Sequence, residues 1–441
     1  AVQKAEEAMM SKAAARSYLP IEGINTYNLG AQTLLLGADS PIIAEGRALT
    51  VQSLGGTGAL KIGADFLQQL LPQSEVYISD PSWENHRALF ERAGFKVNTY
   101  AYYDAATHGL NFDGMIASLR TMPAQSIVVL HACCHNPTGV DPSMEQWTQI
   151  AELIKERQLV PFLDIAYQGF GAGLEEDASV VRLFAKLGLS MFISSSFSKS
   201  FSLYGERVGA LTLVTSSKDE TSRVLSQVKR VIRTNYSNPP THGGKVVATV
   251  LNSPELFQTW ATELAGMRDR IREMRAQLVA KLKEHGATQN FDFVLEQRGM
   301  FSYSGLTAEQ VERLRQEHGI YAVSSGRICV AALNSQNIDF VAKAIAQPCV
   351  EVLWRLLPEY WGKGYATEAA RACMDFGFDE LGLDQIVAYT AQLNLPSQTV
   401  MQRLGMTAQA GTFDHPGVAA GHKLVPHVLY TLDRKDWPQP A

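Results

Sequence analysis

The 441-residue sequence lacks the features that would tie it to a membrane or to nucleic acid. It has no run of about 20 apolar residues, the length that a membrane-spanning helix needs. It also lacks a recognisable signal peptide and any excess of basic charge, since 39 Lys and Arg stand against 44 Asp and Glu. We therefore expect a cytoplasmic protein with neither a membrane nor a nucleic-acid partner.

Cysteine is scarce and its spacing excludes a disulfide framework. The five cysteines are an odd number, with Cys133 and Cys134 adjacent and the others single. The segment His131-Ala-Cys-Cys-His135 could suggest a metal site. Side chains alternate along a strand, however, so these four residues should not converge on one ion. We expect no metal site.

The most informative feature that is present is a lysine among hydroxyl groups. Lys199 comes soon after the strand-like segment 192–195, with Ser196 and Ser198 before it and Arg207 eight residues after it. A lysine in this position can form a Schiff base while the hydroxyls and the guanidinium bind a phosphate dianion. The cofactor that requires both is pyridoxal phosphate (PLP).

Three further segments present suitable groups at predicted strand or helix ends. Asp164 and Tyr167 follow a buried strand, where a carboxylate could keep the pyridine nitrogen protonated and a phenol could bond the ring hydroxyl. Asn136 ends another strand, and ligands of open α/β sheets bind at that edge. Gly56 and Thr57 precede a helix-like segment, whose free N–H groups could bind phosphate.

Residues 1 to about 347 resemble the aspartate/aromatic-amino-acid (tyrosine) aminotransferase family of PLP fold type I. The segments that carry the resemblance are Tyr18-Leu-Pro-Ile-Glu-Gly-Ile, Ser79 to His86, Cys133 to Gly139, Asp164 to Phe170, Ser196 to Gly209 and Tyr236-Ser-Asn-Pro-Pro. The resemblance implies transamination between an aromatic or dicarboxylic L-amino acid and 2-oxoglutarate. The implied mechanism is ping-pong, through a Schiff base at Lys199, with Asp164 and Tyr167 as catalytic partners.

The same resemblance assigns further roles. Trp83 would stack on the PLP ring, and His86 would support Asp164 from behind. Arg327 would grip the substrate α-carboxylate with its planar pair of donors. Tyr18 would reach the phosphate of the neighbouring subunit, and Arg233 would take a side-chain carboxylate across the interface. Trp83 and Asn136 would also contact substrate. These roles imply a homodimer with shared active sites, acting on small amino and keto acids.

Alternating strand-like and helix-like segments predict an α/β fold with a large parallel-sheet domain and a small α/β domain. The expected divisions are a PLP-binding large domain at 1–266, an incomplete small domain at 267–347 and a different segment at 348–441. Apolar residues spaced by three or four predict a long helix from Leu256 to Leu282. In the small domain we expect strands at 291–295, 300–304 and 327–332 and a helix at 308–318. Compared with the family the chain begins late, which predicts a weaker dimer.

Residues 348–441 resemble the second half of a GNAT acetyltransferase of the ribosomal-protein N-acetyltransferase type. The resemblance is carried by a strand-like segment from Glu351, a glycine loop that opens a helix, the strand 385–390, Asn394-Leu-Pro-Ser and Leu404-Gly-Met. The candidate CoA loop comprises Trp361, Gly362, Lys363, Gly364, Tyr365 and Ala366. Acetyl-CoA-dependent N-acetyltransferase activity and an inactive chimera are the alternatives to transamination. Because the first half of that fold is missing, we expect weak or no acetyl-CoA binding and no acetyl transfer.

Overall fold

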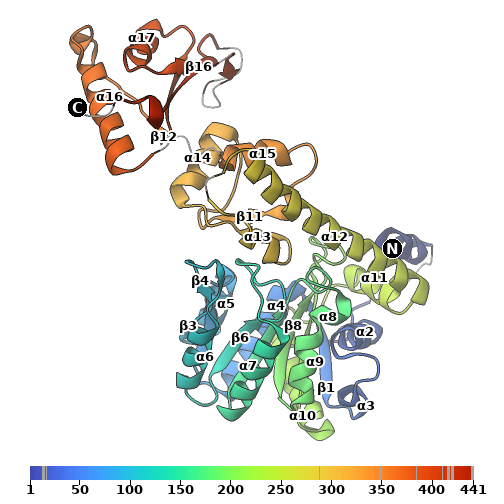
Figure 1. Cartoon of the computed structure of the whole chain (residues 1–441). Helices are drawn as coiled ribbons and strands as arrows, with labels where there is room; N and C mark the ends of the chain where they lie inside the picture. Colours follow the sequence, from blue (N-terminus) through green and yellow to red (C-terminus); the bar gives the residue numbers. More distant parts are fainter. Residues whose placement is uncertain are drawn as a thin grey trace. The chain divides into compact units, whose positions relative to one another are not determined.

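The computed structural model describes residues 1–11, 15, 17–287, 289–346, 350–383, 385–409, 411–414, 418 and 422–438. The chain forms two compact units (Figure 1). The first comprises Ala1–Val279, Phe291–Gly305 and Arg327–Asn334, and the second comprises Ala280–Asn290, Leu306–Gly326 and Ser335–Ala441. The predicted junction at Gln347-Pro348-Cys349 lies outside the described residues, and the three-part division at 266 and 347 stays a prediction.

A seven-stranded sheet forms the centre of the first unit. Its strands are β1 (Ala48–Leu54), β2 (Val76–Asp80), β3 (Val97–Ala101), β6 (Ile127–His131), β7 (Val160–Ile165), β8 (Met191–Ser196) and β9 (Val208–Val214). Their order is β1-β9-β8-β7-β6-β2-β3. The pairs from β8 through β3 are parallel, whereas β9 runs antiparallel to both of its neighbours. The predicted α/β fold with a large, mostly parallel sheet is confirmed.

Helices cover the sheet (Figure 1). They include α2 (Asn25–Leu36), α4 (Gly55–Leu70), α5 (Glu84–Arg92), α6 (Phe112–Thr121), α7 (Met144–Glu156), α9 (Ser179–Lys186), α10 (Lys218–Asn235) and α11 (His242–Leu251). Helix α4 buries Ile62 and Phe66 in one cluster with Phe162 and Phe192 of the sheet. Burying one such side chain stabilises the fold by roughly 1.5–3 kcal/mol, so this cluster fixes α4 firmly against the strands.

The register of the central strands brings their carboxyl ends to one edge. His131 of β6 pairs with Asp164 of β7, and Ile165 pairs with Ser195 of β8. The segments that follow these three strands therefore begin side by side. Shorter elements of the unit are α1 (Val2–Met10), α3 (Pro41–Ala44), α8 (Leu174–Asp177), β4 (Tyr103–Asp104) and β5 (Gly109–Leu110).

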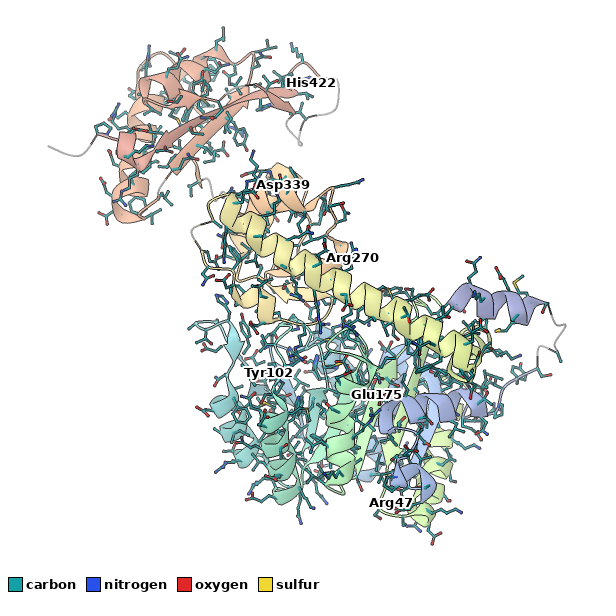
Figure 2. All side chains as sticks on the ribbon, turned by 45° about the vertical axis from the view of Figure 1, so that its right-hand side comes forward. Arg47, Tyr102, Glu175, Arg270, Asp339 and His422 are labelled. Atoms are coloured by element: carbon teal, nitrogen blue, oxygen red, sulfur yellow. The ribbon has the colours of Figure 1, made fainter. Side chains whose placement is uncertain are left out.

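The long helix predicted from Leu256 to Leu282 is present as α12 (Pro254–Glu284), along which Arg270 is labelled in Figure 2. The strand predicted at 291–295 is wrong, because a short helix, α13 (Phe293–Glu296), forms there. Phe291 and Val294, three residues apart, are the buried pair of this segment, which is a helical spacing. Strands β10 (Phe301–Tyr303) and β11 (Arg327–Cys329) pair antiparallel, and a 3₁₀ turn at Val330–Ala332 replaces the end of the strand predicted at 327–332.

The second unit contains helices α14 and α15 and, in its C-terminal part, a second sheet with its own helices. Helix α14 (Ala308–His318) has the predicted bounds and begins with a capping box of Thr307 and Gln310. It is followed in sequence by α15 (Ile338–Ala346). The described residues contain no helix with both the length and the apolar character needed to cross a membrane.

The C-terminal residues form the sheet β12-β13-β16-β14, with β15 also paired to β16. Its elements are β12 (Val350–Glu351), η2 (Pro358–Tyr360), α16 (Tyr365–Asp375), β13 (Gln385–Ala391), α17 (Leu395–Arg403), β14 (Thr407–Ala408), β15 (Phe413–Asp414) and β16 (Pro426–Asp433). The predicted first strand is therefore only two residues long. Met374, Phe378, Ile386, Tyr430 and Trp437 share a buried core.

Candidate active site

A cavity of about 250 Å³ lies at the carboxyl ends of β6, β7 and β8. Its lining contains Gly56, Thr57, Leu60, Trp83, His131, Cys133, Asn136, Asp164, Ala166, Tyr167, Ser196, Ser198, Lys199, Tyr204 and Arg207. Most of the residues proposed from the sequence for the cofactor are thus brought together. The sequence reasoning missed Leu60, His131, Cys133, Ala166 and Tyr204. His131 ends β6, so the strand-end rule that identified Asp164 would also have identified it.

Lys199 is set up to act as a nucleophile. Burial lowers its pKa below the ordinary value, and the charge of Arg207 adds to this effect, although Asp164 opposes it. The lowered pKa increases the fraction of neutral amine, which is the form that attacks a carbonyl group. The Lys199 Nζ atom lies 4.8 Å from the centre of the Tyr167 ring.

One end of the cavity is built to bind an anion. Helix α4 begins with Gly55 and Gly56 and has no side-chain cap. The Gly55 N–H donates to the carbonyl oxygen of Arg207 at 3.0 Å, so the next N–H groups, those of Gly56 and Thr57, are the ones that could bind an anion. Gly55 has φ +69°, and a Cβ there would meet Nη2 of Arg207 at 2.6 Å. Only glycine therefore lets the guanidinium lie so close to the helix start. With the nearby Ser196 and Ser198, these donors fit a phosphate dianion.

A hydrogen-bonded chain behind the cavity determines the state of Asp164. The Asn136 N–H donates to Nδ1 of His131 (3.1 Å), so the proton of that neutral ring is on Nε2, 3.4 Å from Oγ of Ser82. The Ser82 hydroxyl then donates to Nδ1 of His86 (2.9 Å). That leaves Nε2–H of His86 to donate to Oδ2 of Asp164 (2.9 Å).

The pKa values agree with this direction of donation. Burial lowers the pKa of His131 to about 3, so its ring is neutral near pH 7. Burial alone would raise the pKa of Asp164, but the hydrogen bond from His86, helped by the charge of Lys199, outweighs burial and holds that pKa below its ordinary value. Asp164 is therefore a carboxylate in the cavity, suited to pairing with a protonated ring nitrogen.

Arg327 adjoins the cavity through Asn136. Its Nη1 donates to Oδ1 of Asn136 at 2.8 Å, and its guanidinium lies 4.7 Å from the centre of the Phe301 ring. Arg233 and Tyr18 are not part of the cavity. Arg233 hydrogen-bonds Ser237 at the end of α10, and the Tyr18 side chain is 91% exposed.

The two histidines beside the adjacent cysteines, and the nearby Asp177, hydrogen-bond or stack with protein groups. The His131 and His135 rings lie 4.2 Å apart, closer than strand alternation implied, because β6 ends at His131. His135 bonds Ser79 and Thr138 through its two ring nitrogens. Within the described chain, potential ligand atoms of Cys133, Cys134 and Asp177 gather within 4.8 Å, but the oxygens of Asp177 accept three backbone N–H groups of residues 169–172.

A second cavity, of about 560 Å³, belongs to the C-terminal segment alone. Its lining includes Trp361, Gly362, Gly364, Tyr365 and Ala366 of the candidate CoA loop. Gly362 and Gly364 have φ +73° and +88°, and α16 starts directly after them without a side-chain cap. Lys363 instead has its Nζ atom 5.6 Å from the centre of the Tyr360 ring.

Comparisons with known proteins identify the family. The family described as "Aminotransferase class I and II" matches residues 1–345. An aspartate aminotransferase from Pseudomonas aeruginosa is 66% identical over 347 residues, which cover 79% of this chain and 87% of that protein. An aromatic-amino-acid aminotransferase from Escherichia coli is 54% identical over 329 residues, covering 75% and 83%.

The solved structures agree. The crystal structure of an aromatic-amino-acid aminotransferase from Burkholderia pseudomallei, covalently bound to pyridoxal phosphate, has a TM-score of 0.78 and 66% identity and covers 78% of this chain and 86% of that one. The fold is thus PLP-dependent transferase fold type I. This chain belongs to the class I and II aminotransferases.

Proposed function

We propose that this aminotransferase moves the amino group of an aromatic or dicarboxylic L-amino acid to 2-oxoglutarate. One observation supports the proposal most strongly: a single cavity contains Lys199, whose pKa is lowered, and Asp164, which is held as a carboxylate. The start of helix α4, which has no side-chain cap, and Arg207 lie in the same cavity. The names of the similar proteins from Pseudomonas aeruginosa and Escherichia coli favour aspartate and aromatic substrates respectively.

The donor set fits PLP. Gly56, Thr57, Ser196, Ser198 and Arg207 would hold its phosphate, and Trp83 and Asn136 would contact its ring. PLP, when bound, supplies the electron sink that stabilises a carbanion at the substrate's α-carbon. Asp164 would keep the ring nitrogen protonated through the chain of donors from His131, Ser82 and His86. Tyr167 would donate to the ring hydroxyl, since burial raises its pKa and keeps the phenol protonated.

The residues of this chain would divide the remaining work. Lys199 would bind the cofactor aldehyde and then, once released by the incoming amino acid, remove and return the α-proton as general base and acid. Arg327 would bind the α-carboxylate, with Asn136 holding the guanidinium in place. Because every amino acid has an α-carboxylate, Arg327 would serve all substrates alike.

Two of the proposed residues support a homodimer. Tyr18 and Arg233 are outside the cavity of their own chain, and Tyr18 is largely exposed. In the proposal, each serves the site of the other subunit, Tyr18 at the phosphate and Arg233 at a second substrate carboxylate. We place the enzyme in the cytoplasm. The direct test is an assay of glutamate formation from 2-oxoglutarate with L-phenylalanine or L-aspartate. Absence of glutamate with either donor would refute the proposal.

The C-terminal segment, residues 348–441, needs a separate proposal. We propose that it is similar to the latter half of a GNAT acetyltransferase and transfers no acetyl group by itself, since its first strand, β12, is two residues long and is at the end of the sheet order. The 560 Å³ cavity favours a formed CoA loop. Calorimetric titration of the full chain with acetyl-CoA, compared with Gly364→Glu, tests this. Saturable binding that the substitution abolishes would show that the loop holds CoA, and acetylation of an amine would refute the proposal.

A further inference from the structure

The segment between β6 and α7 is held by a carboxylate that is outside the cavity lining. Oδ2 of Asp141 accepts the N–H of Cys134 at 2.7 Å, and Oδ1 accepts the N–H of His135 at 2.9 Å. Cys134 has φ +53°, in the left-handed region that non-glycine residues rarely adopt. Such a conformation persists only where surrounding contacts enforce it, and the Asp141 carboxylate supplies that contact.

Asn136 follows Cys134 and His135 in the chain and contacts both Arg327 and His131. Its side-chain oxygen accepts Nη1 of Arg327, and its N–H donates to His131. Further along the same segment, the carbonyl oxygen of Gly139 accepts the N–H of Arg298 at 2.7 Å. The position of this loop therefore sets where the Asn136 amide meets Arg327.

We propose that Asp141 is a positioning residue for substrate binding: by holding the amides of Cys134 and His135 it fixes Asn136, and through Asn136 the guanidinium of Arg327. The inference rests on the proposed role of Arg327 in binding the α-carboxylate. It assigns to Asp141 no contact with substrate or cofactor.

The groups around Asp141 make this support sensitive to pH. Burial raises its pKa to about 6; the amides of His135 and Cys134 and the charge of Arg298 act against that rise, whereas Asp177 adds to it. Tyr102, labelled in Figure 2, stacks on the His135 ring at 4.0 Å and donates to the carbonyl oxygen of Val140. Burial raises the pKa of Tyr102 as well, so it stays uncharged.

As the pH falls through about 6, Asp141 takes up a proton in the folded protein. One of its oxygens becomes a hydroxyl, which accepts an amide N–H poorly, so one of the two loop hydrogen bonds weakens. The KM for every amino acid should then rise below pH 6 in the wild-type enzyme.

Asp141→Asn tests the inference, because asparagine keeps the shape but offers only one good acceptor. The matched control is Asp104→Asn, a half-buried aspartate outside the site that likewise accepts a backbone N–H, from Ala106. Two readouts are compared. The first is hydrogen–deuterium exchange of residues 132–138 in protein without PLP, and the second is KM and kcat with aspartate and with phenylalanine.

We expect faster exchange in that segment, and a KM roughly 5- to 10-fold higher for both substrates with kcat within about twofold, from the loss of one hydrogen bond. The control should change neither. Unchanged exchange and KM in Asp141→Asn, or a fall in kcat at constant KM, would overturn the inference. If that variant does not fold, a wild-type KM that stays flat from pH 8 to 5 would overturn it instead. A wild type without transamination would sink the proposed function, while the exchange result would still report on Asp141.

Discussion

Replacing Arg327 with lysine tests whether substrate binding needs only a positive charge at this position or also the planar pair of donors of a guanidinium. In the structure Nη1 of Arg327 donates to Oδ1 of Asn136 at 2.8 Å, and the guanidinium lies over the Phe301 ring. The other nitrogens remain for a carboxylate. A lysine ammonium keeps the positive charge but cannot bond Asn136 and also present a parallel pair of donors to the substrate.

The expected loss is that of one charge-assisted hydrogen bond, about 1.5–3 kcal/mol. At about 1.4 kcal/mol for each factor of ten, kcat/KM should fall roughly 10- to 150-fold. Because the α-carboxylate is common to all amino acids, aspartate and phenylalanine should lose the same factor. Steady-state kinetics with both substrates measures it.

The matched control is Arg315→Lys on α14, where an exposed arginine pairs with Glu312. Exposed pairs contribute about 0–1 kcal/mol, so this variant should retain wild-type kinetics. Two results would refute the reasoning: an Arg327→Lys enzyme within twofold of wild type, or a loss confined to one of the two substrates.

Further predictions concern the second substrate carboxylate, the state of Asp164 and the C-terminal core. Arg233→Leu should lower kcat/KM for aspartate, which has a second carboxylate, because the loss of a charged partner costs roughly 2–5 kcal/mol. The kcat/KM for phenylalanine should stay nearly unchanged, and equal losses for the two substrates would show that Arg233 does not bind the second carboxylate. His86→Ala should raise the pKa of Asp164, because the hydrogen bond that most strongly opposes the effect of burial is then lost, so the acid limb of kcat/KM should move to higher pH; an unmoved limb would contradict the donor chain. The lowered pKa of Asp164 also stabilises the folded protein above its unfolded value of about 4, and that contribution is lost as the pH falls through the folded value. Phe378→Ala should cost the C-terminal segment about 3–5 kcal/mol of unfolding free energy, seen by hydrogen exchange, without changing transamination kinetics.

The cavity residues Gly56, Asp164 and Lys199 could be predicted from the sequence because each is at the end of a locally recognisable strand or helix. Asp164 follows an apolar run, Lys199 follows another, and Gly56 opens a helix, so local pattern and the strand-end rule were enough. The long helix α12 and the helix α14 followed from their periodicity and capping residues in the same way.

The family resemblance implied the contact of His86 with Asp164, but the other contacts that support these groups could not be predicted, because they join distant parts of the chain. Ser82 reaches His131 across 49 positions, and Arg327 reaches Asn136 across 191. Neither pair leaves a local pattern. The strand expected at 291–295 failed for a related reason, since Phe-Asp-Phe-Val-Leu fits alternation while tertiary packing buries Phe291, which precedes helix α13, together with Val294 within it.

The central claim is that Lys199 joins PLP in a cavity made for transamination. The most direct test is the absorption spectrum of the purified full chain after incubation with PLP, recorded before and after addition of glutamate. We expect a near-ultraviolet to visible band of covalently bound cofactor that glutamate shifts and that Lys199→Ala lacks. Protein that stays colourless with PLP, or a band that survives unchanged in Lys199→Ala, would contradict it.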